Sequence, residues 1–206
     1  MTRRVFYSFH YQPDNARAAR VRTMGVVEGN KPATDNDWET ITDGGDEAIK
    51  RWIDDQLGGK SCNVVLIGEN TAGRKWIKYE IKTAWENGKG LVGVHIHRLK
   101  DFDGNQASKG RNPFEDFTAG DNDEKLSSIV KTYNPPYSDS KEAYGYISEN
   151  LEDWIEEAIE IRDTYEGCHG KEGLLLLPLP GRYRFSSERR SESLVNEAGS
   201  RSGWFF

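Results

Sequence analysis

Short apolar runs alternate with amphipathic stretches through the first half of the chain. The runs are apolar at nearly every position, which predicts strands buried on both faces of a sheet. Between them, apolar side chains recur every three or four residues, which predicts helices with one buried face. This alternation is typical of an α/β fold in which crossover helices flank a central parallel sheet. The predicted strands cover residues 5–11, 62–67 and 91–96, and the helices cover 15–22, 48–57 and 74–87.

The remaining segments give weaker patterns. Asp14, next to Pro13, is expected to cap the first helix. A long amphipathic helix is expected after Pro135 and Pro136, with its apolar side chains between 147 and 159. The other predictions are a weak strand at 26–27, a loop at 100–117 and a last strand at 126–133.

Length and composition fit one domain with an appendage. With 206 residues, we assign residues 1–168 to the domain and 169–206 to a C-terminal tail outside the core. Within that tail, residues 174–177 are apolar but are followed by prolines and a polar stretch. Hydrophobic residues at 35%, together with 21 glycines, exclude a chain that is disordered throughout.

Charge and cysteine content narrow the partners and the compartment. A net charge of −6 argues against a general nucleic-acid binder, which needs a basic face. The chain has no apolar run near the roughly 18 residues of a membrane span, and its first residues do not resemble a signal peptide. Two cysteines, Cys62 and Cys168, fit a reducing cytoplasm better than a disulfide scaffold.

The topology predicts where a ligand would bind. In an open parallel sheet, ligands lie beyond the carboxyl ends of the strands, here Ser8–Tyr11, Gly68–Asn70 and His95–Arg98. The helix at 74–87 begins at the same edge, and its Glu80 lies on the flank of the apolar face, one turn after Trp76. Glu80 is therefore expected to be half-buried beside an aromatic ring, and a solvated glutamate is the alternative.

Other kinds of site have less support. His95 and His97 share one strand face, but a third metal ligand is not evident nearby, so no metal site is predicted. The glycine in the Asp101–Asn105 segment comes too early for a calcium loop. The chain lacks a Walker loop and a G-x-G-x-x-G motif. A phospho-receiver would require aspartates at strand ends that here read His10-Tyr11 and Gly68-Glu69.

Several of these segments together resemble a TIR-like domain, in particular the TIR proteins of the Thoeris antiphage system. The Trp76/Glu80 pair, a W-x-x-x-E motif, is the most specific element, and the similarity covers residues 3–160. The resemblance implies a flavodoxin-like fold. The segments that carry it are VFYSFHYQ at 5–12, VVLIGENT at 64–71, RKWIKYEI at 74–81, GVHI at 93–96 and KGRNPF at 109–114.

The resemblance also implies a function. Glu80 would be the catalytic residue for NAD cleavage, and NAD would be a substrate, with no separate cofactor. The product would be a cyclic ADP-ribose-type signal that activates a separate effector protein, and the domain would be able to form homo-oligomers. A non-catalytic TIR adaptor that acts by homotypic assembly is the alternative. The nucleotide-binding residues would be Ser8, Phe9, His10, Tyr11 and Trp76.

Overall fold

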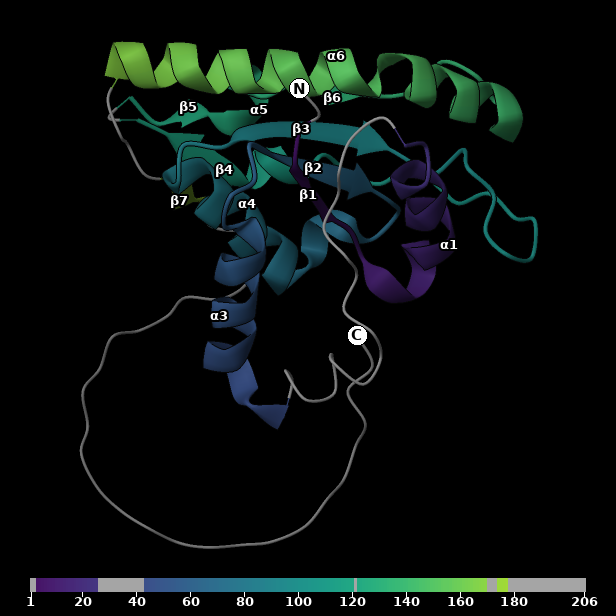
Figure 1. The fold of residues 1–206 in the computed structure, drawn as a ribbon, viewed down its shortest axis with the longest axis horizontal. Coiled ribbons are helices and arrows are strands. Elements are labelled where there is room, and N and C mark those ends of the chain that lie inside the picture. Colours follow the sequence, from purple (N-terminus) through teal and green to yellow (C-terminus); the bar gives the residue numbers. More distant parts are fainter. Residues whose placement is uncertain (1–2, 26–42, 121, 170–173, 178–206) are drawn as a thin grey trace, which may run out of the picture.

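Four parallel strands form the main sheet of the computed structural model, which describes residues 3–25, 43–120, 122–169 and 174–177. Their order is β1-β2-β3-β6 (Figure 1). Every residue of the first three strands is buried, as their apolar runs predict. The α/β class is thereby confirmed. The strands are β1 (Val5–Ser8), β2 (Cys62–Ile67), β3 (Gly90–His95) and β6 (Thr132–Tyr133).

Helices cover both faces of this sheet. Because side chains alternate along a strand, Val5 and Tyr7 pack toward α1 (Tyr11–Arg22) and α6 (Ser140–His169). The intervening Phe6 packs on the other face with α3 (Gly45–Leu57) and α4 (Lys75–Glu86). The long helix α6 runs along its face of the sheet (Figure 1). Two separate apolar clusters result, one on each side of the strands.

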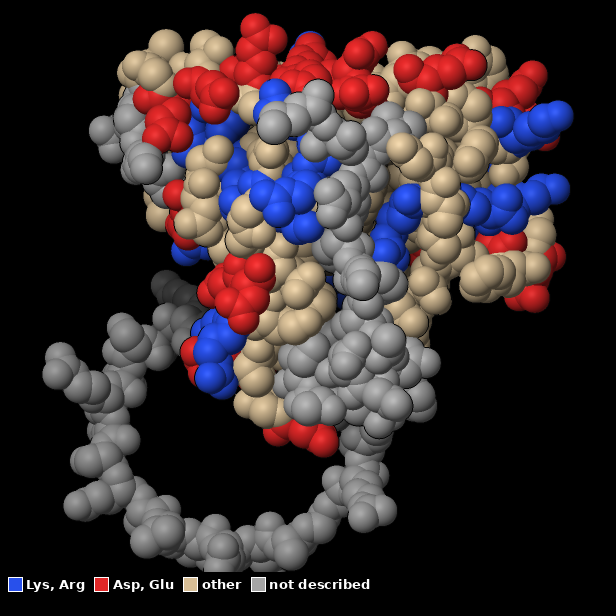
Figure 2. All heavy atoms as spheres, viewed as in Figure 1, with Lys and Arg blue, Asp and Glu red and all other residues tan. Residues whose placement is uncertain are grey.

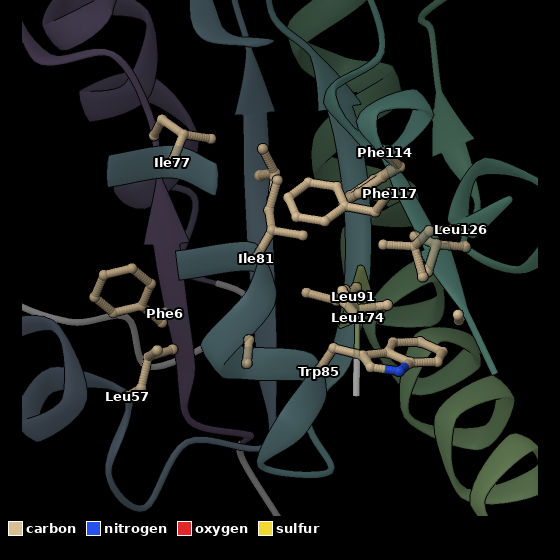
Figure 3. Close-up of a cluster of buried hydrophobic side chains, with 14 of the residues drawn as sticks. Phe6, Leu57, Ile77, Ile81, Trp85, Leu91, Phe114, Phe117, Leu126 and Leu174 are labelled. Carbon is tan, nitrogen blue, oxygen red and sulfur yellow. The ribbon is translucent and has the colours of Figure 1, made fainter. Parts of the chain in front are cut away.

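A second, antiparallel sheet has the order β5-β4-β7. In its last strand, Leu174 is 3% exposed and belongs to the same apolar cluster as Trp85 and Phe117 (Figure 3). The prediction that residues 169–206 lie outside the core is therefore wrong for Leu174. A strand of three residues buries only one side chain, which is too short a pattern to recognise in the sequence. The elements of this region are η2 (Pro113–Asp116), β4 (Phe117–Ala119), β5 (Glu124–Lys125), α5 (Leu126–Ile129) and β7 (Leu174–Leu176).

Two boundaries differ from the prediction. The first strand ends at Ser8, because α1 already begins at Tyr11. Pro13 is tolerated there, since first-turn amides need no partner within the helix. His10 occupies the N-cap position and Asp14 lies inside the first turn, so the prediction of Asp14 as the cap is wrong.

The predicted strand at 126–133 is also largely wrong. Its first half forms the short helix α5, and only Thr132–Tyr133 pair with β3. The predicted strand at 26–27 lies outside the described residues. The predicted helices correspond to α1, α3, α4 and α6.

Leu174→Ala should lower the free energy of unfolding by about 2–5 kcal/mol, because it leaves a cavity beside Trp85. Leu175→Ala is the matched control: its side chain is 62% exposed, so a change below about 0.5 kcal/mol is expected. Urea denaturation of both variants measures the difference. Equal stability of the two variants would show that β7 does not contribute to the core.

Candidate active site

Helix α4 carries the candidate carboxylate, Glu80. Its apolar side chains Ile77, Ile81 and Trp85 recur with helical spacing and point into the core beneath the helix (Figure 3). Glu80 lies beside Ile81, and only 8% of its surface is exposed. It is therefore more deeply buried than its position on the flank of the helix predicts.

The surroundings of Glu80 disfavour its charge. Oε2 of this residue has no hydrogen-bond partner among the described residues. Burial raises the pKa of Glu80 to about 8, and a hydrogen bond with the Ser8 side chain opposes this shift only in part. The protein thus holds a carboxyl group that is mostly protonated at neutral pH.

Ser8 connects Glu80 to a second buried polar side chain. The Ser8 hydroxyl group donates a hydrogen bond to Oδ1 of Asn63 at 2.9 Å. Ser8 is 1% exposed and Asn63 is fully buried. Asn63 is not among the site residues predicted from the sequence; the available signal was its place as an amide side chain within the otherwise apolar strand CNVVLI.

Three histidines lie at the strand ends. Burial is the main cause that lowers the pKa of His10 to about 4, and Arg74 adds to the shift. Burial, followed by Lys109 and His97, lowers the pKa of His95 to about 4 as well. The rings of His95 and His97 are 5.8 Å apart. All three have lowered pKa values, so the strand ends carry neutral imidazoles at pH 7.

The aromatic residues predicted to bind the ligand lie on different faces of the main sheet. Phe9 packs against the cluster formed with α1 and α6, so the structure does not bring it to Glu80. Tyr11 begins α1 and is 41% exposed, with its ring 6.3 Å from that of Phe9. Trp76 lies one turn before Glu80 on α4, and Nζ of Lys75 lies 4.5 Å from the centre of its ring. Trp76 and Ser8 are therefore the candidates that the structure places with Glu80.

A buried arginine fixes the end of α4. Arg162 of α6 donates hydrogen bonds to the Trp85 carbonyl group at 3.1 and 3.3 Å, and its guanidinium lies 4.6 Å from the centre of the Trp85 ring. A cation at a helix C-terminus is favourable because the last carbonyl groups carry partial negative charge. This contact joins α4 to the long helix across the amino-terminal edge of the sheet.

Acidic side chains gather over the long helix α6. Figure 2 shows acidic side chains along the outer surface of α6. A groove beside the end of this helix is lined by Glu124, Glu157 and Glu160, so it is unsuited to an anionic ligand.

Across the described ranges, the structure has no group of three or more His, Cys, Asp or Glu residues arranged to hold a metal ion. In the same ranges, none of the helices is both long enough and apolar enough to cross a membrane.

The parallel sheet with helices on both faces is an α/β fold consistent with a TIR-like, flavodoxin-like domain, and α4 carries a buried glutamate one turn after an aromatic residue. Residues 6–101 match the family model described as "Thoeris protein ThsB, TIR-like domain". The resemblance found in the sequence is thus confirmed.

A curated relative matches as well. It is the "Putative cyclic ADP-D-ribose synthase ThsB1" of Bacillus cereus (strain MSX-D12), which is 41% identical over 120 residues. The match covers 56% of this chain and 62% of the relative, so it spans less than two thirds of the relative's length.

Glu80→Gln should stabilise the protein at alkaline pH. Because the folded-state pKa is raised from 4.5 to about 8, the native state binds the proton more tightly and wild-type stability falls as pH rises through this range. Glutamine cannot ionise, so its advantage should grow to roughly 1–4 kcal/mol by pH 8. Denaturant titrations at pH 5 and pH 8.5 measure the difference in unfolding free energy between the two proteins. The histidines with lowered pKa values do not contribute to this difference, because both proteins contain them. A pH-independent difference between the two proteins would contradict the burial of this carboxyl group.

Proposed function

We propose that this protein cleaves NAD at the bond between nicotinamide and ribose and forms a cyclic ADP-ribose-type product. The product would act as a diffusible signal on a separate effector protein in antiphage defence. We place the reaction in the cytoplasm, with Glu80 as the catalytic residue and NAD as substrate rather than as a bound cofactor. The family match and the name of the Bacillus cereus relative support this assignment.

The single observation that carries the proposal is the buried carboxyl group of Glu80, with Oε2 unpartnered among the described residues. A buried polar group without a partner destabilises a fold, so its retention is explained best by a ligand that satisfies it. The nicotinamide ring of NAD is cationic. A cation beside Glu80 would lower the pKa of the carboxyl group and favour the charged form that catalysis requires.

One carboxylate is sufficient for this reaction. When the bond from the ribose carbon to the ring nitrogen breaks, its electron pair moves to that nitrogen and nicotinamide leaves as a neutral molecule. No general acid is therefore needed, unlike in ordinary glycoside hydrolysis. The ribose carbon becomes electron-poor, and the Glu80 carboxylate would stabilise this positive charge in a site with little water.

The product depends on which nucleophile attacks the ribose carbon. Water would give ADP-ribose, whereas a nucleophilic atom of the adenosine part would close a ring and release one proton. Exclusion of water favours the second outcome. The deep burial of Glu80 supports a cyclic product for this reason.

A non-catalytic adaptor is the second candidate, and the structure gives it less support. An adaptor that works by assembly requires an exposed contact surface, not a buried carboxyl group with a raised pKa. In such a protein, replacement of Glu80 by an uncharged residue would only increase stability.

Glu80→Gln should reduce NAD cleavage by about 100-fold or more, because it removes the charge and keeps the shape of the side chain. Glu86→Gln is the matched control, since Glu86 lies on the same helix and is exposed. Release of nicotinamide and formation of cyclic product are measured by chromatography and mass spectrometry on the purified proteins. Near-wild-type turnover by a folded Glu80→Gln protein would leave the adaptor as the better assignment.

Phe9→Ala and Tyr11→Ala should affect different properties. Phe9 packs in the apolar cluster below α1, so its loss should lower the melting temperature. Tyr11 is 41% exposed at the start of α1, so its loss should leave the melting temperature nearly unchanged. If its ring stacks on the ligand, as we propose, NAD use should fall by the equivalent of about 0.5–1.5 kcal/mol. Thermal melts and NAD turnover on both variants test the distinction, and unchanged turnover of Tyr11→Ala would exclude it from the site.

A further inference from the structure

We infer that Asn63 is a positioning residue for Glu80: its amide group sets whether the Ser8 hydroxyl group accepts a hydrogen bond from Glu80 or donates one to it. This inference rests on the proposed function, because it concerns the same carboxyl group. It assigns a role to a side chain in the middle of β2, below the edge where the ligand would bind.

The geometry contains an imbalance that points to this role. In the arrangement observed, the single proton of the Ser8 hydroxyl group is directed to Oδ1 of Asn63, at 2.9 Å. Nδ2 of Asn63 then has no hydrogen-bond partner within the described parts of the chain, although the residue is fully buried. With its proton on Asn63, the Ser8 oxygen can only accept from the protonated Glu80. The lowering effect of Ser8 on the Glu80 pKa belongs to the opposite arrangement, in which Ser8 donates to the carboxylate.

A half-turn of the amide group reverses this chain of hydrogen bonds. Exchange of the two amide positions places Nδ2 where it donates to the Ser8 oxygen, and Ser8 can then direct its proton to the Glu80 carboxylate. The oxygen and nitrogen of a side-chain amide occupy nearly the same positions, so the two arrangements need the same space. The half-turn also replaces an unpartnered buried N–H group with an unpartnered carbonyl oxygen, which is tolerated more often.

Asparagine suits this position because it can both donate and accept. A leucine side chain of similar size could do neither, and Ser8 would lose the partner that orients it. An ionised aspartate could only accept, so it would hold the Ser8 proton and add a negative charge near Glu80. Asn63 therefore allows Glu80 to be neutral in the empty site and charged during the reaction.

Neighbouring groups do not obscure a titration of Glu80 near pH 8. Burial and Ser8 are the causes that shift its pKa within the described ranges. His10 and His95 at the strand ends have pKa values of about 4. Asp116, which pairs with Lys78 of α4 and with Arg111, has a pKa below its usual range, and the pKa of Tyr79 is raised above its usual range.

The test measures the Glu80 titration directly and then through activity. Carbon-13 NMR of labelled glutamate carboxyl groups follows Glu80, with Glu80→Gln to assign the signal. Asn63→Leu leaves the Glu80 carboxylate as the acceptor for the Ser8 proton, so it should lower the midpoint by about one pH unit. Asn63→Asp holds the Ser8 proton and adds negative charge, so it should raise the midpoint by about one unit or more. For Asn63→Asp, an upward shift of one unit corresponds to a loss of about tenfold in kcat/KM for NAD at pH 7, with recovery at more alkaline pH.

Controls separate positioning from general damage to the fold. Cys62→Ala changes the preceding buried residue, which faces the opposite side of the sheet, and should leave the midpoint unchanged. Ser8→Ala removes the donor to Glu80 and should raise the midpoint, and Asn63→Leu should have no further effect in the Ser8→Ala background. If Asn63→Leu does not fold, the near-isosteric Asn63→Asp decides by the same measurement.

The outcomes also separate this inference from the proposed function. An unchanged Glu80 midpoint in both Asn63 variants, or an equal shift in Cys62→Ala, would overturn the role of Asn63 even if Glu80→Gln abolishes NAD cleavage. Conversely, a wild-type protein that does not cleave NAD would overturn the proposed function. The NMR titration would still decide whether Asn63 controls Glu80, because it requires no substrate.

Discussion

The removal of one carboxyl group from water is the constraint on which the arrangement of the site depends. Burial of Glu80 opposes ionisation, and the fold must offset the cost of holding its unpartnered oxygen. Ile77, Ile81 and Trp85 do so from the same helix, because burial of such side chains contributes about 1.5–3 kcal/mol each. Three such contributions exceed the roughly 1–3 kcal/mol expected for one unsatisfied neutral group. The apolar face of α4 therefore dominates, and Glu80 is buried as a consequence.

Close backbone contacts shape the edge of the sheet where the candidate site lies. A Cβ atom at Gly68 would lie 2.0 Å from the Asp14 carboxylate, and one at Gly110 would lie 1.9 Å from the Gly68 carbonyl oxygen. Gly110 requires glycine, because the atoms that its Cβ would meet are backbone, and a side chain at Gly68 would displace the buried Asp14 carboxylate. The contacts hold the segment around Gly110 against the end of β2, near enough for Lys109 to lower the pKa of His95.

The fold was predictable from the sequence wherever burial is regular. The strands at 62–67 and 91–96 and the helix that carries Glu80 follow from runs and spacings that repeat over several residues. Leu174 was not predictable, because a single buried side chain in a three-residue strand leaves no periodic signal. Glu80 could be placed on the flank of its helix, but the depth of its burial depends on neighbours distant in sequence. The link from Asn63 to Ser8 depends on strand pairing, which the sequence alone does not specify.

The protonation states suggest how such a site tolerates its own burial. At neutral pH the empty site holds a mostly protonated Glu80 and neutral rings at His10 and His95, so these buried groups carry little charge. A charge buried without a partner would cost several kcal/mol, which is a large part of the stability of a domain this size. A cationic ligand changes this balance, because it makes the ionised carboxylate the favoured form. Under the proposed function, the substrate thus supplies the charge that activates Glu80, and the protein avoids the cost of a buried carboxylate while the site is empty.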